Sequence, residues 1–382
     1  HRYNYSFGEK NTFIENLNYL ESATILNFKN LKLKKKEIFL NSPLRNKKIN
    51  KNIDYNFHKN NIPKILKNTF LKNPEIDNSS IIGLSGGLDS TSVAATLGSS
   101  NIKLDAFTAY YGTSKKTVLD ESKKASLVAK RFCNKWFKIK IDSNEFLKYW
   151  KNCYRTFDFP VCTSSFLGYL ILYKKISKFG YKKIINAGNS DLFFYGNYPC
   201  YLYRLLDLYY SNKSLFKIEL NSWIKNHSTP SFPKSLQTFL DFKKNLEFKT
   251  TKKLKHIKPK QEIKKNDYFK KKKNIKIKEH RYKYSFIGST YLEAYIKYAI
   301  WMGEKQPNIL PFDEIEKISK VNSLDPYLSE TLKEYFYNLP DSFKIKNGIE
   351  KKILRDAFTG ILPSEITKNY DKTGFNVPFL IW

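Results

Sequence analysis

The sequence "LSGGLDS" places two glycines, a carboxylate and two hydroxyls between an apolar run and a segment with helical spacing. A strand, a glycine turn and a helix in this order direct several backbone N–H groups and the positive end of a helix dipole at one point, which is chemistry for binding an anion. Gly86 and Gly87 would let the backbone approach a phosphate closely. Ser85 and Ser90 would add hydroxyl donors. The carboxylate of Asp89 would repel a bare phosphate, so it predicts a bridging Mg²⁺.

This stretch differs from two common phosphate-binding loops. It lacks the lysine of a GxxxxGK[ST] loop and the glycine spacing of a GxGxxG dinucleotide turn. An ordinary glycine-rich turn, with Asp89 or Ser90 as a helix cap, would use the same residue types without any ligand. The elements around the stretch must therefore show whether other polar groups meet it.

The segments around this stretch alternate between strand-like and helix-like patterns, which predicts βαβ units and a mostly parallel sheet. In such sheets ligands bind beyond the carboxyl ends of the strands, where Ser85 and Gly188 fall. We expect strands at 81–85, 104–111, 136–141 and 182–188, and helices at 90–98, 120–132 and 164–180, the second of these capped by Asp120.

The regions outside this alternating core have other patterns. Residues 1–60 contain short apolar alternations, which predict terminal strands, followed by a polar linker, and a helix is expected from Ile62 to Pro74. The lysine-dense tract at about 226–284 has too little apolar area to fold alone, so we expect a mobile insertion. After it, helical spacing at 289–303, 327–339 and 350–363 predicts a helical C-terminal half.

Composition limits the partners of the chain. The net charge of +33 comes mostly from lysine, as in proteins from AT-rich coding sequence, so we consider a nucleic-acid partner unlikely. No apolar run is long enough to span a bilayer, no signal peptide opens the chain, and Cys133, Cys153, Cys162 and Cys200 lack zinc-site spacing. We expect a cytoplasmic protein with reduced thiols. Because the first residue is His1, we also expect a fragment of a longer chain.

Two motifs far apart in the chain carry a resemblance to a known family. The stretch "SGGLDS" is similar to the SGGxDS loop of synthetases that cleave ATP to AMP and pyrophosphate, namely the asparagine, GMP, argininosuccinate and lysidine synthetases. The ending "KKILRDAFTGILPSEITKNYDKTGFNVPF" resembles that of asparagine synthetases, which reads K-x-I-L-R, then L-P, then K-x-G-F-x-x-P. The resemblance to the asparagine synthetase family covers about residues 61–382, and the tail from Asn11 looks like the last strands of the family's amidotransferase domain.

This resemblance implies a fold, a domain division and a reaction. The fold would be α/β, a doubly wound parallel sheet of the adenine-nucleotide alpha-hydrolase (ATP pyrophosphatase) type with a helical C-terminal half. Residues 1–60 would be the tail of an amidotransferase-like domain with a linker, and residues 61–382 the synthetase domain. The enzyme would use ATP and Mg²⁺ to adenylate a small-molecule carboxylate, releasing pyrophosphate. It would then transfer ammonia, supplied by glutamine through an N-terminal glutaminase domain or a partner, and release AMP.

The resemblance also implies roles for individual residues. Asp89 and Asp191 would hold the metal, and Lys372 would contact pyrophosphate and the forming intermediate as a point charge. Lys351 and Arg355 match K-x-I-L-R, and Arg355 either acts in catalysis or only braces its helix. ATP and pyrophosphate would lie against Leu84, Ser85, Gly86, Gly87, Asp89, Ser90, Thr108, Ala109, Ala187 and Gly188.

Departures from the family pattern concern the acceptor of the acyl group. In the family's G-E-G-x-D-E motif, this chain has Gly188 and Leu192 in place of the two glutamates, one of which is a candidate base for the incoming amine. In addition, Tyr370 replaces an arginine, and the lysine after Leu362 and Pro363 comes one residue late. Alternatives therefore stay open: a sugar carboxylate or peptide substrate, as in β-lactam or macrolactam synthetases, a tRNA-modifying or RNA-binding protein, or a non-catalytic binding module.

Overall fold

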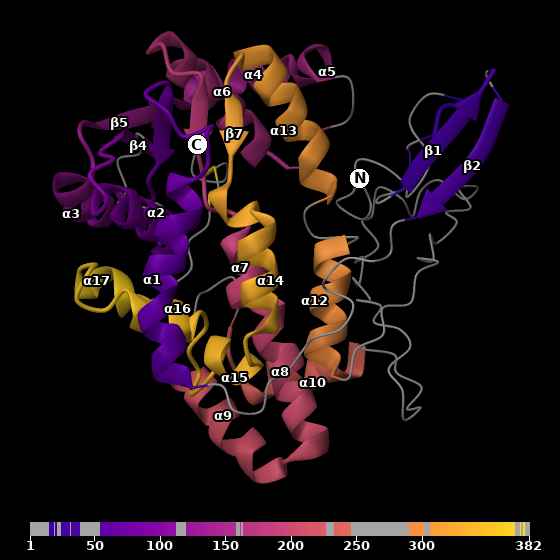
Figure 1. The fold of residues 1–382 in the computed structure, drawn as a ribbon, viewed down its shortest axis with the longest axis vertical. Coiled ribbons are helices and arrows are strands. Elements are labelled where there is room, and N and C mark those ends of the chain that lie inside the picture. Colours follow the sequence, from indigo (N-terminus) through magenta and orange to yellow (C-terminus); the bar gives the residue numbers. More distant parts are fainter. Residues whose placement is uncertain are drawn as a thin grey trace.

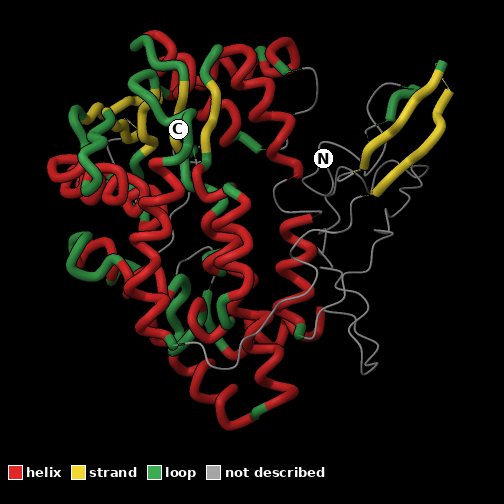
Figure 2. The backbone as a smooth tube through the Cα atoms, in the orientation of Figure 1, coloured by secondary structure: helices red, strands yellow, loops and turns green. Residues whose placement is uncertain are grey.

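Within the part of the chain that the structure describes, five strands form one parallel sheet in the order β5-β4-β3-β6-β7 (Figures 1 and 2). The four strands and the parallel pairing predicted from the sequence are confirmed, and a fifth strand at the edge comes from the C-terminal half. The strands are β3 (Ser80–Gly83), β4 (Asp105–Tyr111), β5 (Trp136–Ile141), β6 (Lys183–Ile185) and β7 (Asn322–Leu324).

This computed structural model describes the chain in several ranges: residues 15–18, 20, 24–30, 32–38, 54–111, 120–157, 161, 163–226, 233–245, 290–301, 306–370, 375 and 377–378. Some of the predicted features lie outside these ranges. Lys372 and the tract from 246 to 284 lie outside the described residues. Of the predicted terminal strands, β1 (Thr24–Lys29) and β2 (Lys32–Ile38) form an antiparallel pair.

Helices cover both faces of the sheet, and the alternation of side chains along the strands explains why. Ile82 and Ile185 point to one face, where they join the core formed with α1 (Tyr55–Leu71), α2 (Leu88–Gly98) and α3 (Ser122–Phe132). Their neighbours Ile81 and Ile184 point to the other face, toward α4 (Ser143–Lys151), α6 (Ser165–Lys178) and α13 (Gln306–Ser319). Successive strand residues face opposite sides, so a continuous apolar run marks a strand buried on both. The predicted doubly wound α/β fold is confirmed.

A separate apolar cluster, built entirely from helices, extends the molecule beyond the carboxyl ends of the strands (Figure 1). It includes α10, which lies within the lysine-dense tract predicted as an insertion, and Phe239 of α10 is fully buried. Residues 236–245 of that tract are therefore packed helix and not part of a mobile insertion. Most of the cluster comes from α8 (Tyr198–Ser211), α9 (Lys213–Asn226), α10 (Leu236–Asn245) and α12 (Tyr291–Trp301), and Leu192 and Tyr337 from two further helices join it.

The C-terminal half is mostly helical, as expected, but it also returns to the sheet. β7 pairs with β6, and α13 packs against α6 although it contains Pro311. Neither element was predicted, because three residues are too short to show alternation and a proline usually marks a helix boundary. The remaining elements are α5 (Cys153–Thr156), α7 (Ser190–Phe194), η2 (Pro326–Leu328), α14 (Glu330–Asn338), α15 (Asp341–Lys344), α16 (Lys352–Ala357) and α17 (Ser364–Thr367).

The sequence analysis also made expectations about membrane spans and about the cysteines. None of the helices in the described ranges has the length and apolarity that a membrane span would require. Cys133, Cys153 and Cys200 form no disulfide with one another, and Cys162 lies outside the described residues.

Candidate active site

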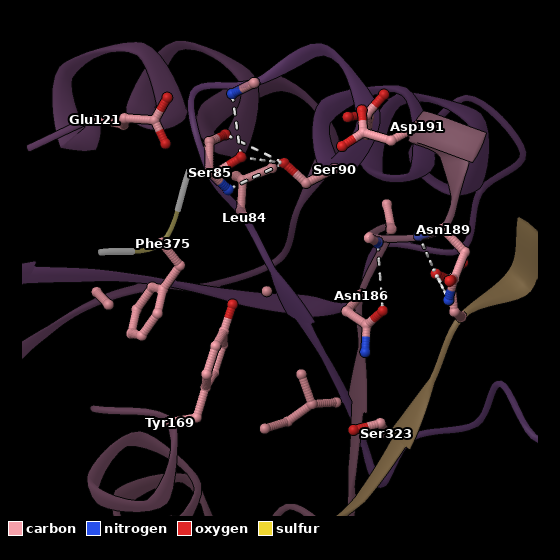
Figure 3. Close-up of a pocket in the computed structure, with 18 of the residues that line it drawn as sticks. Leu84, Ser85, Ser90, Glu121, Tyr169, Asn186, Asn189, Asp191, Ser323 and Phe375 are labelled. Atoms are coloured by element: carbon pink, nitrogen blue, oxygen red, sulfur yellow. Dashed lines mark hydrogen bonds between the residues drawn. The ribbon is translucent and has the colours of Figure 1, made fainter. Parts of the chain in front are cut away.

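The glycine loop follows β3, and its own side chains hold its shape (Figure 3). The backbone N–H of Ser85 donates to the hydroxyl of Ser90 over 3.0 Å, and the two hydroxyl oxygens lie 2.8 Å apart. The N–H of Gly87 donates to Ser85 Oγ over 3.1 Å, and α2 begins at the next residue, Leu88. The predicted strand, turn and helix are confirmed, and both serines brace the turn from within.

Gly86 and Gly87 have different reasons to be glycines. A Cβ on Gly86 would lie 2.8 Å from Lys124 Cβ and 3.1 Å from Glu121 Cβ, so α3 packs directly on this backbone. Gly86 does not line the cavity described below, whereas Gly87 does. Close packing of a helix therefore accounts for Gly86, and only Gly87 faces the space where a ligand would bind.

An ammonium group lies between two carboxylates beside this loop. Lys351 Nζ pairs with Asp89 Oδ2 and lies 2.5 Å from Asp191 Oδ1. Asp89 stands in the first turn of α2 and Asp191 in the first turn of α7, so two helix starts present both carboxylates at the same edge of the sheet. The exposed fractions of the three side chains are 9% for Lys351, 22% for Asp89 and 16% for Asp191.

The turn before Lys351 is anchored to the helical cluster. Glu219, which is 6% exposed, accepts the backbone N–H of Asn347 over 3.1 Å and that of Gly348 over 3.3 Å. Gly348 has φ +76°, and a Cβ there would lie 2.3 Å from Ser222 O, so only glycine suits this position. Lys351 itself has φ 56° and is the N-cap residue of α16. The buried carboxylate thus fixes the backbone that carries the lysine.

Opposing effects act on the Lys351 ammonium. Burial by itself lowers its pKa, but the attraction and hydrogen bonds of Asp191 and Asp89 together outweigh burial, so the pKa of Lys351 lies above the ordinary lysine value. Lys351 therefore stays protonated while it holds both carboxylates.

The two carboxylates also fit a divalent metal. Asp89 Oδ1 is buried and has no hydrogen-bond partner among the residues that the structure describes, and a buried carboxylate oxygen of this kind suits a hard cation. In those same ranges no group of three or more His, Cys, Asp or Glu side chains is arranged around one metal position. The protein would therefore offer two carboxylate ligands, and ATP and water would supply the others.

The end of β6 forms the opposite side of the site. The backbone N–H of Asn186 donates to Leu324 O over 2.8 Å, and both the backbone and the side-chain N–H of Asn189 donate to Asp325 Oδ2, over 2.8 and 2.9 Å. Asp325, which directly follows β7, thereby holds the turn that leads into α7 and so to Asp191. The sequence analysis missed Asp325, since nothing local marks it as a partner of this turn.

Gly188 and Leu192, which stand where the motif has glutamates, lie in different environments. Gly188 lines the cavity together with Ala187. Leu192 is 5% exposed and belongs to the apolar cluster of helices. A leucine here strengthens that cluster, and neither position provides a carboxylate.

The middle of β4 presents Thr108 and Ala109 to the cavity. The Thr108 hydroxyl donates to Leu84 O over 2.7 Å and accepts from Trp136 Nε1 over 2.9 Å, and Thr108 is 4% exposed. Its side chain therefore links the middle of β4 to the end of β3 and to the first residue of β5, while Leu84 and Ala109 form part of the cavity wall.

Arg355 also lines the cavity, yet it bonds to the backbone of the C-terminal segment. Its guanidinium donates to the carbonyls of Glu350, Thr367 and Asn369 over 2.9, 3.1 and 2.8 Å. It also lies 5.1 Å from the ring centre of Tyr370, and burial lowers its pKa. In this geometry it braces the approach to Lys372, which lies outside the described residues, and the catalytic role of Arg355 stays a prediction.

One cavity of about 710 Å³ joins these groups. Every predicted site residue in the described ranges lines it except Gly86. Its far wall is aromatic: Tyr169 stacks on Phe375 with ring centres 4.1 Å apart, and the Tyr169 hydroxyl points toward the glycine loop (Figure 3). The sequence analysis missed this wall, because its aromatic residues come from α6 and the C-terminal segment, two parts of the chain that only the fold brings together.

Other missed lining residues carry carboxylates. Glu316 accepts the backbone N–H of Ser323 over 2.9 Å, and burial, followed by the charge of Glu314, raises the pKa of Asp313. Glu121 faces the glycine loop, and its pKa is raised by burial, although Lys124 and the N–H of Gly86 counteract this. The sequence "DES" around Glu121 suggested only a helix cap. Asp120 does accept the N–H of Ser122 over 2.9 Å.

The chain is similar to known proteins over different parts of its length. A family model described as asparagine synthase matches residues 79–382. The asparagine synthetase (glutamine-hydrolyzing) 1 of Bacillus subtilis (strain 168) is 37% identical over 70 residues, which are 18% of this chain and 11% of that protein. An NMN synthetase structure from Francisella tularensis aligns with 40% of this chain and 58% of its own, at 13% identity and a TM-score of 0.27.

The family model spans the parallel sheet, the glycine loop and the segment that carries Lys351 and Arg355. The short alignment covers too little of the Bacillus subtilis protein to transfer its whole activity. The match over residues 79–382 is enough to conclude that the chain belongs to the asparagine synthase family, a family of ATP-dependent amide-forming ligases.

Proposed function

We propose that this protein adenylates a small-molecule carboxylate with ATP and then forms an amide with ammonia derived from glutamine, as an asparagine synthase does. The observation that carries the proposal is the meeting of the glycine loop with Asp89, Asp191 and Lys351 at one cavity. A loop with amide donors suits the phosphates, and the adjacent charges suit a reaction in which pyrophosphate leaves.

In the first step, a carboxylate oxygen attacks the α-phosphorus of ATP, and the bond between that phosphorus and the pyrophosphate oxygen breaks. Negative charge then grows on the leaving pyrophosphate. The N–H groups of the glycine loop and the start of α2 would bind the phosphates, while Lys351 and Lys372 would supply positive charge. Arg355 would hold the segment that carries Lys372. Leu84, Thr108 and Ala109 would bound the adenine.

Mg²⁺, when bound, would neutralise charge on the transferring phosphates, and Asp89 and Asp191 are the residues that would hold it. Asp89 Oδ1 supports this assignment, since it is buried without a hydrogen-bond partner among the described residues. Asp325 would orient Asp191 indirectly, through the Asn189 turn.

In the second step, an amine attacks the acyl carbon, the bond to AMP breaks, and the nitrogen loses a proton. Neither Gly188 nor Leu192 can accept that proton, so the group that takes the proton would differ from that of a family member with both glutamates. This difference favours a second candidate, a related synthetase that acts on a sugar carboxylate or a peptide. A cavity of about 710 Å³ with an aromatic wall has room for such a substrate beside ATP.

The proposal includes the surroundings of the synthetase domain. Residues 1–60 would be the tail of a glutaminase-type domain with a linker, ammonia would come from that domain or from a partner, and the protein would act in the cytoplasm. If the full-length protein carries a glutaminase domain, glutamine should support its reaction as well as ammonium does.

Release of pyrophosphate and AMP tests the proposed activity. The purified protein is incubated with ATP, Mg²⁺, glutamine or ammonium, and a panel of amino-acid, sugar and peptide carboxylates. We expect one class of carboxylate to stimulate release, and Asp89→Asn to reduce it at least about 100-fold because the phosphates lose a metal ligand. Asp142→Asn, which alters the cap of α4, is the matched control and should retain activity. Release that persists unchanged in Asp89→Asn would refute the site assignment.

A further inference from the structure

The cavity has cationic side chains with different partners. In the described ranges, Lys351 and Arg355 are the cationic side chains among the lining residues. Arg355 donates to three backbone carbonyls, whereas among the described residues the Lys351 ammonium pairs with the carboxylates of Asp89 and Asp191. The lysine therefore lies between the two carboxylates that the proposed metal would use.

Burial makes this placement energetically important. The three side chains are between 9% and 22% exposed, so water screens their charges poorly. Two carboxylates without a cation would repel each other and would lose hydration without compensation. With the ammonium the group carries one net negative charge, and without it two. A divalent cation suits the second arrangement better than the first.

The structure fixes the backbone of Lys351, while the flexible side chain of a lysine lets the ammonium move. The Lys351 backbone is held in the left-handed region, and its Cε passes so close to Gly196 that a Cβ on that glycine would lie 1.9 Å away. A lysine has a flexible four-carbon stem and a compact charge, so its ammonium can move between neighbouring anions while its Cα stays in place. The phosphates of ATP, bound at the glycine loop, would be such anions.

We propose that Lys351 is an internal counter-cation that makes divalent-metal binding at Asp89 and Asp191 conditional on ATP. Without nucleotide, the ammonium neutralises the carboxylates and opposes a dication. With nucleotide, the ammonium turns to the phosphates, and the carboxylates become available to the metal. This inference rests on the proposed function, in which both aspartates are metal ligands. It implies positive coupling, so metal and nucleotide should each tighten the binding of the other by the same factor.

Direct titration with Mn²⁺ tests the inference without any turnover. Free Mn²⁺ is measured by electron paramagnetic resonance, with and without α,β-methylene-ATP, whose scissile bond is blocked. In the wild-type protein the nucleotide analogue should tighten Mn²⁺ binding strongly. Lys351→Met should bind Mn²⁺ at least about tenfold more tightly than wild type in the absence of nucleotide, and its coupling to the analogue should shrink by the same factor.

The neighbouring lysine offers a matched control. Lys352 pairs with Asp356 over 2.6 Å, away from the two aspartates, so Lys352→Met makes the same chemical change and should leave Mn²⁺ binding at the wild-type level. Lys351→Gln, which retains hydrogen-bond donors, serves if Lys351→Met fails to fold. Unchanged or weaker Mn²⁺ binding in both Lys351 variants would overturn the inference.

Two further measurements separate this inference from the proposed function. Asp191→Asn should abolish the Mn²⁺ binding gained by Lys351→Met, which places the metal between the same carboxylates. Pyrophosphate release by the wild-type protein is measured independently. If release occurs and Lys351→Met does not tighten Mn²⁺ binding, the conditional role of Lys351 is wrong while the ligase proposal stands.

Discussion

The ion pair between Lys351 and Asp191, 2.5 Å from Nζ to Oδ1, joins the start of α16 to the first turn of α7. The pair connects the C-terminal segment to the end of the parallel sheet, so the completeness of the site depends on how the last part of the chain packs. Gly196 lies directly against both side chains, which makes it the most sensitive neighbour of this pair.

Gly196→Ala should damage the site through this contact. The added Cβ would lie 1.9 Å from Lys351 Cε and 2.4 Å from Asp191 Oδ1, so both side chains would have to move. We expect the free energy of unfolding in urea to fall by about 1–3 kcal/mol, as for other overpacked buried positions, and pyrophosphate release to fall with it. Gly83→Ala is the control for stability, because its nearest new contact is 3.4 Å. Equal stability of the two variants would contradict the packing described here.

Arg355→Lys tests whether the guanidinium braces the C-terminal segment. Lysine cannot reproduce bonds to the carbonyls of Glu350, Thr367 and Asn369 from one planar group. We expect a loss of about 1–3 kcal/mol of stability and faster amide exchange at Lys368 and Asn369. Arg131→Lys, which removes a single exposed bond to Ile361 O, should change neither. Full activity with rapid exchange in this segment would show that the segment need not be ordered.

Thr108→Val tests the junction that the Thr108 hydroxyl makes between β4, the end of β3 and the start of β5. The change keeps the shape of the side chain but removes the hydroxyl that donates to Leu84 O and accepts from Trp136 Nε1. Because two buried partners lose a bond, the free energy of unfolding should fall by about 1–3 kcal/mol in a urea titration. Thr69→Val, which removes one bond within α1, should have a smaller effect. A neutral result for Thr108→Val would mean that the loop does not need this junction.

Asp207 should make stability depend on pH. Its carboxylate accepts the N–H of Tyr291 over 2.6 Å and that of Leu292 over 3.2 Å at the start of α12, and burial raises its pKa to about 7. The folded protein then binds more protons than the unfolded chain between about pH 4 and pH 7, so this group's contribution to stability falls as the pH rises through that window.

Urea unfolding at pH 5 and pH 8 measures this contribution. Asp207→Asn should flatten the pH dependence, since the amide does not titrate. Asp241→Asn, an exposed position on α10, should retain the wild-type profile. If Asp207→Asn and wild type lose stability equally between pH 5 and pH 8, Asp207 is not the responsible group.

The sequence predicted the sheet and the glycine loop because their signals are local. Apolar runs marked β3, β4 and β6, the alternation of isoleucine with exposed lysine marked β5, and the residue order around Asp89 marked the turn. The contacts of Lys351 with Asp89 and Asp191 could not be predicted in the same way, because three separate helix starts form them only after folding. The strand β7 was too short to show a pattern, and the reason for Gly86 lay in the packing of α3.

Leu192 shows a further limit of prediction from sequence. Its position in a motif indicated a missing acid, but the structure shows a residue of the apolar helical cluster. The motif indicated that a glutamate is missing at this position, and only the fold shows that the leucine packs in the helical cluster. The role of Tyr169 is likewise visible only in the fold: its hydroxyl points into the cavity from an apolar helix (Figure 3).

The central claim is that this cavity joins a carboxylate to AMP, and an isotope experiment tests it most directly. A carboxylate that supports pyrophosphate release is labelled with ¹⁸O in its carboxyl group, and the products with ATP and ammonium are analysed by mass spectrometry. Adenylation predicts one ¹⁸O atom in the phosphate of AMP and none in pyrophosphate, because the carboxyl oxygen stays with the α-phosphorus. ADP with labelled inorganic phosphate, or AMP without label, would contradict the account.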